Sequence, residues 1–394
     1  MTTTTETAEL DPANAEIVTA TLPLIGANID AITTAFYRRL FENHPQLLRN
    51  LFNRGNQAQG AQQRALAASI ATFATHLVDP ALPHPVELLS RIGHKHASLG
   101  IVAEQYPVVH DNLFAAIVEV LGADTVTAEV AAAWDQVFWI MAGALIDLER
   151  ALYAGAGVRD GDVYRRAQVL SRVDDPSGAV EVTVAPLAAG TLSFAPGQYV
   201  SVGVTLPDGA RQLRQYSLIN VSSSSGELTF AVKPAGEVST WIRDNLRVGD
   251  LLDVTVPFGD LPTPTPGAPL VLISAGVGIT PMIGILEAVE PATRVVVLHA
   301  DRSGQTHPLR DRQRELVAAL PDATLDVWYE EGAQGSAGEH VGFLRLDEVD
   351  LPAGAEVYLC GADGFVRAVR DQLISRGVQR VHCELFSPND WLLS

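Results

Sequence analysis

Cysteine is scarce in this sequence of 394 residues, which contains only Cys360 and Cys383. Two cysteines cannot build a disulfide framework, and their scarcity fits a reducing compartment. The pattern of apolar residues shows no run that approaches the roughly 20 residues of a membrane span, and the Thr-rich start from Met1 to Thr7 lacks the regions of a signal peptide. We therefore expect a cytoplasmic protein without an integral membrane segment.

Positive charge is also in short supply. Lysine and arginine together number 27, against 46 aspartates and glutamates, so the net charge is −19. Such a surface repels nucleic acid and anionic lipid. The balance excludes a nucleic-acid partner and favours an enzyme that acts on small molecules; we further expect a monomer.

The chain is long enough for two or three domains. From Ala13 to Tyr153 the apolar residues recur at helical spacing, as in Ile32, Phe36 and Leu40, which predicts an all-α region. The small residues Ala154–Gly157 end this pattern.

The remaining chain changes character twice. Short β-rich runs, separated by Pro, Gly and Ser, predict an antiparallel barrel with one helix near Thr240–Asn245; the runs are 179–184, 199–204, 228–232 and 251–256. After the stiff linker Leu261–Gly267, apolar strands alternate with helical patterns, which predicts a parallel, doubly wound α/β sheet. We expect three domains, at residues 1–153, 158–264 and 268–394.

His96 is the residue to weigh first for chemistry. Its predicted helix places Leu89, Ile92, His96 and Leu99 on one apolar stripe, so the imidazole would point into the interior, while His94 would point away. Taken alone, such a histidine is more often a core residue than a metal ligand. Both interpretations stay open at this point.

A second candidate is the loop Gly276–Pro281, which follows the predicted strand Leu270–Ser274 and precedes a helix. Glycine permits close approach of a ligand to the backbone, and a helix N-terminus favours phosphate. A bare G-x-G turn has many other uses, so the loop alone is a weak signal.

Nine short motifs occur in an order that narrows the interpretation. They are Phe36–Phe41, Gly60–Leu66, Lys95–Ser98, Glu104–Tyr106, Gly197–Tyr199, Arg214–Ser217, Ile273–Gly278, Tyr358–Gly361 and Glu384–Pro388. With this set the chain resembles the flavohaemoglobin family over nearly its whole length. The resemblance implies a globin, an FAD-binding barrel and an NAD(P)-binding domain. It also implies nitric oxide dioxygenase activity, in which nitric oxide and dioxygen become nitrate as electrons pass from NAD(P)H through FAD to haem b.

In the globin, the resemblance assigns His96 as the iron ligand, with Tyr106 and Glu149 behind it to increase electron donation to the iron. It places Tyr37 and Gln62 on the opposite face of the haem, where their O–H and N–H groups can donate to dioxygen, with Phe52 against the haem edge. It places Lys95 near the junction of haem and flavin. Ordinary roles in packing or at the solvent surface remain open for these side chains.

In the reductase part, the resemblance assigns several groups to cofactors. Arg214 can pair with phosphate, Tyr216 can stack on the flavin, and Ser217 can bond its N5 edge. Further predicted contacts are Tyr199 and Gln215 for the flavin or adenine; Gly236, Val238 and Ser239 for the pyrophosphate; Gly276, Val277, Gly278, Ile279, Thr280, Pro281 and Cys360 for the nicotinamide nucleotide; and Glu384, Leu385, Phe386, Ser387 and Pro388 for closure over the flavin.

Some questions stay open from the sequence. Asp301 argues against a 2′-phosphate, whereas Arg302 and Ser303 argue for one, so the choice between NADH and NADPH is undecided. A lipid in the distal pocket is also open. The alternative functions are a ferric, flavin or hydroperoxide reductase, and an oxygen carrier or sensor.

Overall fold

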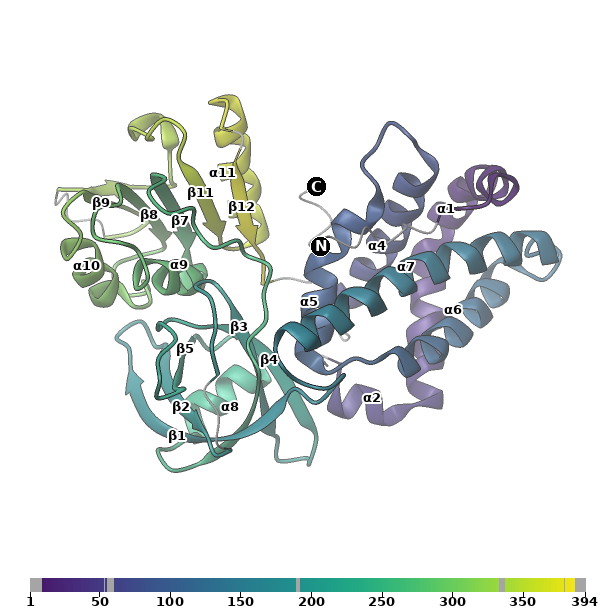
Figure 1. Cartoon of the computed structure of the whole chain (residues 1–394), viewed down its shortest axis with the longest axis horizontal. Coiled ribbons are helices and arrows are strands. Elements are labelled where there is room, and N and C mark those ends of the chain that lie inside the picture. The colour runs from purple at the N-terminus through teal and green to yellow at the C-terminus, as the bar shows by residue number, and fades with distance from the viewer. Residues whose placement is uncertain are drawn as a thin grey trace. The chain divides into compact units, whose positions relative to one another are not determined.

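The computed structural model describes residues 9–52, 54, 60–188, 192–332, 337–378 and 380–386. The chain forms two compact units. The first contains the helices up to Val163 and also the segment Pro207–Leu213. The second contains Tyr164–Leu206 and the described residues from Arg214 onward. Figure 1 shows the helices of the first unit and the two sheets of the second. Within the described residues, one hydrophobic core lies among the helices and one lies at each of the two sheets. The predicted fold class, an all-α part followed by an antiparallel and then a parallel sheet, is confirmed.

The helical unit is built from long helices that pack side by side. The order along the chain is α1 (Pro12–Asn43), α2 (Pro45–Asn50), α4 (Ala61–Val78), η1 (Pro85–Leu89), α5 (Ser90–Leu99), η2 (Ala103–Gln105), α6 (Tyr106–Leu121) and α7 (Ala128–Gly155). Helix α1 begins where Asp11 accepts a hydrogen bond from the N–H of Ala13, 3.0 Å away. Helix α7 begins likewise at Thr127, whose hydroxyl accepts from the N–H of Val130.

Helix α1 differs from what the sequence pattern led us to expect. By length and composition it is apolar enough to cross a membrane, with a mean hydropathy of 1.3 in an 18-residue window of which 22% is buried. Its buried side chains, among them Ile25, Ile32 and Phe36, nevertheless join the helical core. Helix α1 packs against α4, α6 and α7. The apolar residues of α1 are therefore used, at least in part, to build the globular unit.

The first sheet is antiparallel and curled. Its strands are β1 (Tyr164–Asp174), β2 (Val180–Pro186), β3 (Tyr199–Thr205), β4 (Arg211–Ser217), β5 (Leu228–Val232) and β6 (Leu251–Thr255), in the order β4-β3-β6-β1-β2-β5, with α8 (Glu237–Asn245) after β5. An isolated bridge between Leu218 and Phe230 brings the chain just beyond β4 next to β5 at the other edge. Strands β1 and β4 were not among the predicted runs, because both carry charged or polar side chains at many positions.

The second sheet is parallel throughout its pairings. It comprises β7 (Leu270–Ala275), β8 (Val295–Asp301), β9 (Ala323–Tyr329), β10 (Glu339–Val341), β11 (Glu356–Cys360) and β12 (Val381–Glu384), in the order β10-β9-β8-β7-β11-β12. The intervening helices are η3 (Gly276–Gly278), α9 (Ile279–Leu286), α10 (Arg310–Ala318), η4 (Leu346–Glu348) and α11 (Asp363–Ser375). The strand order reverses between β7 and β11, and ligands of such sheets bind at the carboxyl ends next to this point.

Candidate functional site

His96 lies in the last turn of α5, and two side chains from other helices hold its ring. The Nδ1 atom lies 2.8 Å from Oε1 of Glu149 on α7 and 3.2 Å from the hydroxyl oxygen of Tyr106 at the start of α6. The Tyr106 hydroxyl donates to the same Glu149 oxygen at 2.5 Å. Because a carboxylate accepts from Nδ1, the geometry assigns the proton to Nδ1 and leaves the Nε2 lone pair for a metal ion.

The burial of this trio fits a haem ligand. The Glu149 side chain is 2% exposed, whereas that of His96 is 33% exposed. Burial, and then the neighbouring Glu149 carboxylate, raise the pKa of Tyr106, so the phenol stays protonated and donates. An imidazole fixed at Nδ1 by a buried carboxylate, with part of its ring accessible, is suited to ligate haem iron through Nε2.

A close approach of α5 to α7 makes these contacts possible. A Cβ atom on Gly93 would lie 2.4 Å from Cδ2 of Leu148, the residue before Glu149. The buried positions of α5 are Gly93, Ala97 and Ser98. Of the predicted stripe, Leu89 is buried, whereas Ile92, His96 and Leu99 are half-buried. Gly93 was not predicted from the sequence; its signal is a small residue one helical turn before the histidine.

Tyr37 lies on α1 in a cluster of aromatic rings. Its ring centroid is 4.8 Å from that of Phe36, 5.7 Å from that of Phe41 and 6.0 Å from that of Phe52. Burial raises the pKa of Tyr37, so its hydroxyl is protonated and can donate a hydrogen bond. The structure thus brings together Tyr37 and Phe52, two residues predicted for the distal face of the haem.

Gln62 lies on α4 and Lys95 lies on α5. Gln62 is in the first turn of α4, just after Gly60, whose φ of 68° starts the helix, and α4 packs against α1. Lys95 precedes His96 on α5 and is half-buried. Their roles toward dioxygen and the haem–flavin junction stay predictions.

The predicted flavin motif forms the end of β4. The guanidinium Nη2 of Arg214 lies 3.5 Å from Oε1 of Glu237, and Gln215 donates to the Ser201 hydroxyl at 2.9 Å. The Tyr216 ring stacks on Phe230 with 5.5 Å between centroids, and Ser217 is buried. Gln215 is thus used, at least in part, to tie β4 to β3.

The hydroxyl of Tyr216 provides a test of whether these residues suit a flavin. Its oxygen is buried, and within the described part of the chain it has no hydrogen-bond partner. Burial also raises the pKa of Tyr216, so this phenol is a protonated donor. A buried donor without a partner costs about 1–3 kcal/mol, and a polar ligand group placed there would remove that cost. The site therefore fits a flavin.

Tyr199 and the start of α8 border the same sheet. Tyr199 exchanges two backbone hydrogen bonds with Phe258, at 2.8 and 2.9 Å, which fixes the beginning of β3. In the first turn of α8, the Ser239 hydroxyl accepts hydrogen bonds from the N–H groups of Ala235 and Gly236, which precede the helix, at 2.9 and 3.0 Å. The first helical bond runs from the N–H of Thr240 to Gly236, so the N–H groups of residues 237–239 form the positive end of the helix.

The loop after β7 meets the end of β11, as the reversal of strand order predicts. Gly276 has a φ of 52°, and a Cβ atom on Gly278 would lie 2.5 Å from the carbonyl oxygen of Cys360. The side chains of Ile279, Thr280 and Pro281 are buried, and the Thr280 hydroxyl donates to the carbonyl of Val277 at 3.0 Å. Contacts from these three residues to a nucleotide would therefore come from the backbone.

The C-terminal predictions lie partly within the described residues. Cys360 is buried and pairs in register with Glu384 on β12. Leu385 is buried, whereas Phe386 is 49% exposed and available to cover a ligand. Ser387 and Pro388 lie outside the described residues, so their predicted contacts stay predictions.

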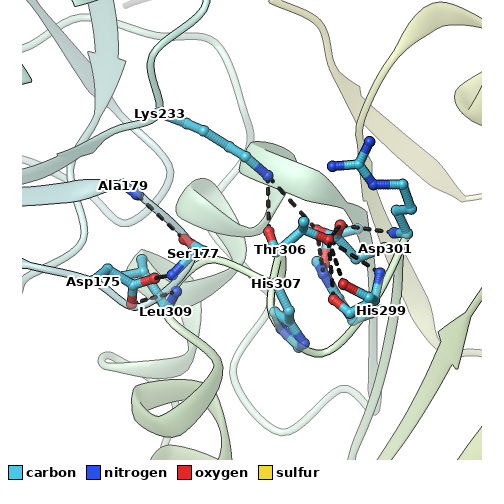
Figure 2. A network of polar contacts seen from close by, with 12 residues as sticks. Asp175, Ser177, Ala179, Lys233, His299, Asp301, Thr306, His307 and Leu309 are labelled. Atoms are coloured by element: carbon cyan, nitrogen blue, oxygen red, sulfur yellow. Dashed lines mark hydrogen bonds and ion pairs between the residues drawn. The ribbon is translucent and has the colours of Figure 1, made fainter. Parts of the chain in front are cut away.

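A buried polar network surrounds the end of β8 and was not predicted. His299 Nδ1 and the Ser274 hydroxyl are 2.8 Å apart, and the His299 ring stacks on His307 with 3.8 Å between centroids. Asp301 accepts from Thr306 at 2.6 Å, and Lys233, which follows β5, donates to the carbonyl of Thr306 at 2.8 Å (Figure 2). Lys233 thus joins the first sheet to the turn that follows β8, as the side chains in Figure 2 show.

Because His299 and His307 are buried, we expect the folded state to lose stability in mild acid. Burial lowers the pKa of both His299 and His307, so they stay neutral in the folded state, whereas the unfolded chain takes up protons below about pH 6.5. We expect the stability of this part to be full above about pH 7.5 and to fall below pH 6.5, by up to roughly 1.4 kcal/mol per pH unit for each histidine. Hydrogen exchange of the β8 amides, corrected for the pH dependence of intrinsic exchange, would measure it.

A variant provides the control for this pH dependence. His307→Gln keeps a hydrogen-bonding side chain near Tyr329, 2.9 Å from His307 Nδ1, and removes one titrating group. The slope between pH 6.5 and 5 should then be smaller than that of the unchanged protein, because one of the histidines whose pKa is lowered by burial is gone. An equal slope in both proteins would contradict the assignment.

The comparisons with known proteins decide the family. Profiles described as globin, oxidoreductase FAD-binding domain and oxidoreductase NAD-binding domain match residues 34–145, 170–262 and 272–371. The flavohemoprotein of Bordetella parapertussis is 39% identical over 96% of this chain and 98% of its own length; that of Bacillus subtilis is 32% identical over 96% and 98%. The chain belongs to the flavohaemoprotein family. The predicted resemblance is thereby confirmed.

Solved structures agree with membership of the flavohaemoprotein family. The flavohemoglobin of Malassezia yamatoensis, solved with bound FAD and heme, matches with a TM-score of 0.87 and 34% identity, over 96% of this chain and all of that one. The FAD/NAD-binding domain of nitric oxide dioxygenase from Vibrio cholerae matches 56% of this chain and 98% of its own, with a TM-score of 0.54 and 31% identity. The order of the three parts is thus the same as in a whole flavohaemoprotein.

Proposed function

We propose that this flavohaemoprotein is an NAD(P)H-dependent nitric oxide dioxygenase, which detoxifies nitric oxide by converting it with dioxygen to nitrate. When bound, FAD accepts a hydride from NAD(P)H and passes single electrons to haem b, whose iron activates dioxygen for reaction with nitric oxide. The observation that carries the proposal is the contact of His96 with Glu149 and Tyr106, because a carboxylate behind the imidazole favours oxygen activation over storage.

In the globin, residues on one face of the haem would bind the iron, and residues on the other face would bind dioxygen. His96 would hold the iron through Nε2, and Glu149 accepts a hydrogen bond from the Nδ1–H of the same ring. Tyr37, protonated by virtue of its burial, would donate to dioxygen, together with Gln62. Phe52 would shield the haem edge beside Tyr37, and Lys95 would lie toward the flavin.

In the reductase part, the residues would bind and orient two nucleotides. Arg214 and the first turn of α8, through Gly236, Val238 and Ser239, would take the pyrophosphate of FAD, while Tyr216 and Ser217 would contact its ring system. Tyr199 and the segment Glu384–Pro388 would complete that site. The Gly276–Pro281 loop and Cys360 would receive NAD(P)H where the order of the parallel strands reverses.

Several finer statements belong to the same proposal. We place the domains at 1–153, 158–264 and 268–394, and the three matching profiles lie inside these bounds. The two cysteines are free, which supports a reducing, cytoplasmic setting. A monomer and a lipid in the distal pocket stay predictions.

The decisive test is nitric oxide consumption by the haem- and FAD-loaded protein in air-saturated buffer. We expect rapid, NADH-dependent loss of nitric oxide, with nitrate formed in step with the nitric oxide consumed. Consumption no faster than in the blank, while NADH is still oxidised, would show that electrons leave at the flavin. The reductase alternative would then replace the dioxygenase.

A further inference from the structure

Glu237 contacts the arginine that is proposed to bind FAD. It is the first residue of α8, and its Oε1 lies 3.5 Å from Nη2 of Arg214. The Arg214 side chain is 20% exposed and that of Glu237 is 35% exposed, so the pair is only partly screened by solvent. A carboxylate is therefore paired with the guanidinium that the flavin motif supplies.

The same carboxylate is placed at a second positive group. The N–H groups of residues 237–239 precede the first helical hydrogen bond, which runs from Thr240 to Gly236. A negative side chain in the first turn interacts favourably with this end of the helix, typically by 0.3–1 kcal/mol. Glu237 thus pairs with Arg214 and lies in the first turn of α8, and a pyrophosphate would use both of these positive groups.

We propose that Glu237 is an internal substitute for the FAD pyrophosphate and weakens FAD binding. This inference rests on the proposed function, because it requires FAD to bind at Arg214 and α8. A pyrophosphate that binds Arg214 would compete with the Glu237 carboxylate for the guanidinium, and it would bring two further negative charges close to that carboxylate. Both effects raise the free energy of the bound state relative to the free protein, because like charges in a partly screened site repel.

Glu237 would affect the affinity of the protein for its flavin rather than the chemistry of the reaction. Without FAD, the positive charge of Arg214 is already compensated, so the empty site is stable. Loading then depends on the free FAD concentration. A neutral side chain at position 237 would remove the competition while leaving Arg214 and the N–H groups of α8 in place.

The test is the dissociation constant of FAD, measured by the quenching of flavin fluorescence on titration of the full-length, haem-loaded apoflavoprotein. For Glu237→Gln we expect binding to be tighter by about threefold to tenfold, as expected for loss of one partly exposed ion pair and one repulsion. Because salt screens both, the difference should shrink toward twofold or less at roughly 1 M salt. Asp244→Asn makes the same charge change near the other end of α8, where Asp244 pairs with Arg243, and should alter the constant by less than about twofold.

A double-mutant cycle separates the role of the ion pair from a general effect on folding. If Glu237 acts through Arg214, Glu237→Gln should tighten binding by less in an Arg214→Gln background than in the unchanged chain. Equal or weaker FAD binding by Glu237→Gln would overturn the inference, because Glu237 would then orient Arg214 or have no effect. Failure of the unchanged protein and of every variant to bind FAD would instead overturn the proposed function.

Discussion

Replacement of His96 by alanine is expected to abolish haem binding while FAD remains bound. Removal of only the hydrogen-bond partner of a metal-bound histidine already lowers metal affinity by roughly 10- to 100-fold, so loss of the ligand itself should exceed about 100-fold. The FAD residues Arg214–Ser217 and those at the start of α8 lie in a separate compact unit and should be unaffected. The absorbance of haem and flavin in the purified, haem-reconstituted protein measures both outcomes at once.

Two further proteins make this result interpretable. His94→Ala changes a histidine on the same helix, two residues away, and should keep the haem spectrum. In His96→Ala the buried Glu149 carboxylate loses its imidazole partner and keeps the bond from Tyr106, so added imidazole should occupy the cavity and restore the haem spectrum. A normal haem spectrum in His96→Ala without imidazole would refute the assignment of His96 as the ligand.

The sequence was sufficient to predict those features that are encoded locally. Alternating burial in β2 and continuous burial in β7 follow directly from their apolar patterns. The apolar pattern around His96 drew attention to this residue on α5, and its role as the iron ligand stays a prediction. Its partners Tyr106 and Glu149 were named from the resemblance, and the structure brings them within hydrogen-bond distance of its ring.

Other features depend on contacts between segments far apart in the chain. Strand β1 carries arginines and an exposed leucine, and it is a strand because β2 and β6 pair with it on either side. Gly93 is important only because Leu148 packs on it, and Glu237 only because β4 brings Arg214 to it. Helix α9 begins at Ile279, within the segment Gly276–Pro281 that the sequence predicted as a loop before the helix. Local composition carries no signal for any of these pairings.

Replacement of Gly278 by alanine is expected to disrupt nicotinamide nucleotide binding. The added Cβ would lie 2.5 Å from the oxygen and 2.6 Å from the carbon of the Cys360 carbonyl, and 2.8 Å from the nitrogen of Gly361. These are backbone atoms of a fully buried strand end, so they cannot move aside as a flexible side chain can. The loop after β7 must shift instead, away from the position where the strand order reverses and a nucleotide binds.

We expect Gly278→Ala to lower the free energy of unfolding of the second unit by about 1–3 kcal/mol, the usual cost of overpacking. The dissociation constant of NADH should rise by at least about tenfold, since a displacement of the loop of about 1 Å removes well-aligned backbone contacts to phosphate. FAD binding should change less than NADH binding, because Arg214, Tyr216 and Ser217 lie on the other sheet. The measurements are chemical denaturation and titration of the FAD-loaded protein with NADH.

Gly364→Ala is the matched control for this prediction. Gly364 is in the first turn of α11, three residues after Gly361, and a Cβ atom there meets nothing within 4 Å. Alanine also favours the helix over glycine, by up to about 1 kcal/mol. The control should therefore bind NADH as the unchanged protein does and be no less stable. If Gly278→Ala behaved in the same way, the contact of the loop with Cys360 would not be what restricts position 278 to glycine, and the nucleotide site would have to lie elsewhere on the sheet.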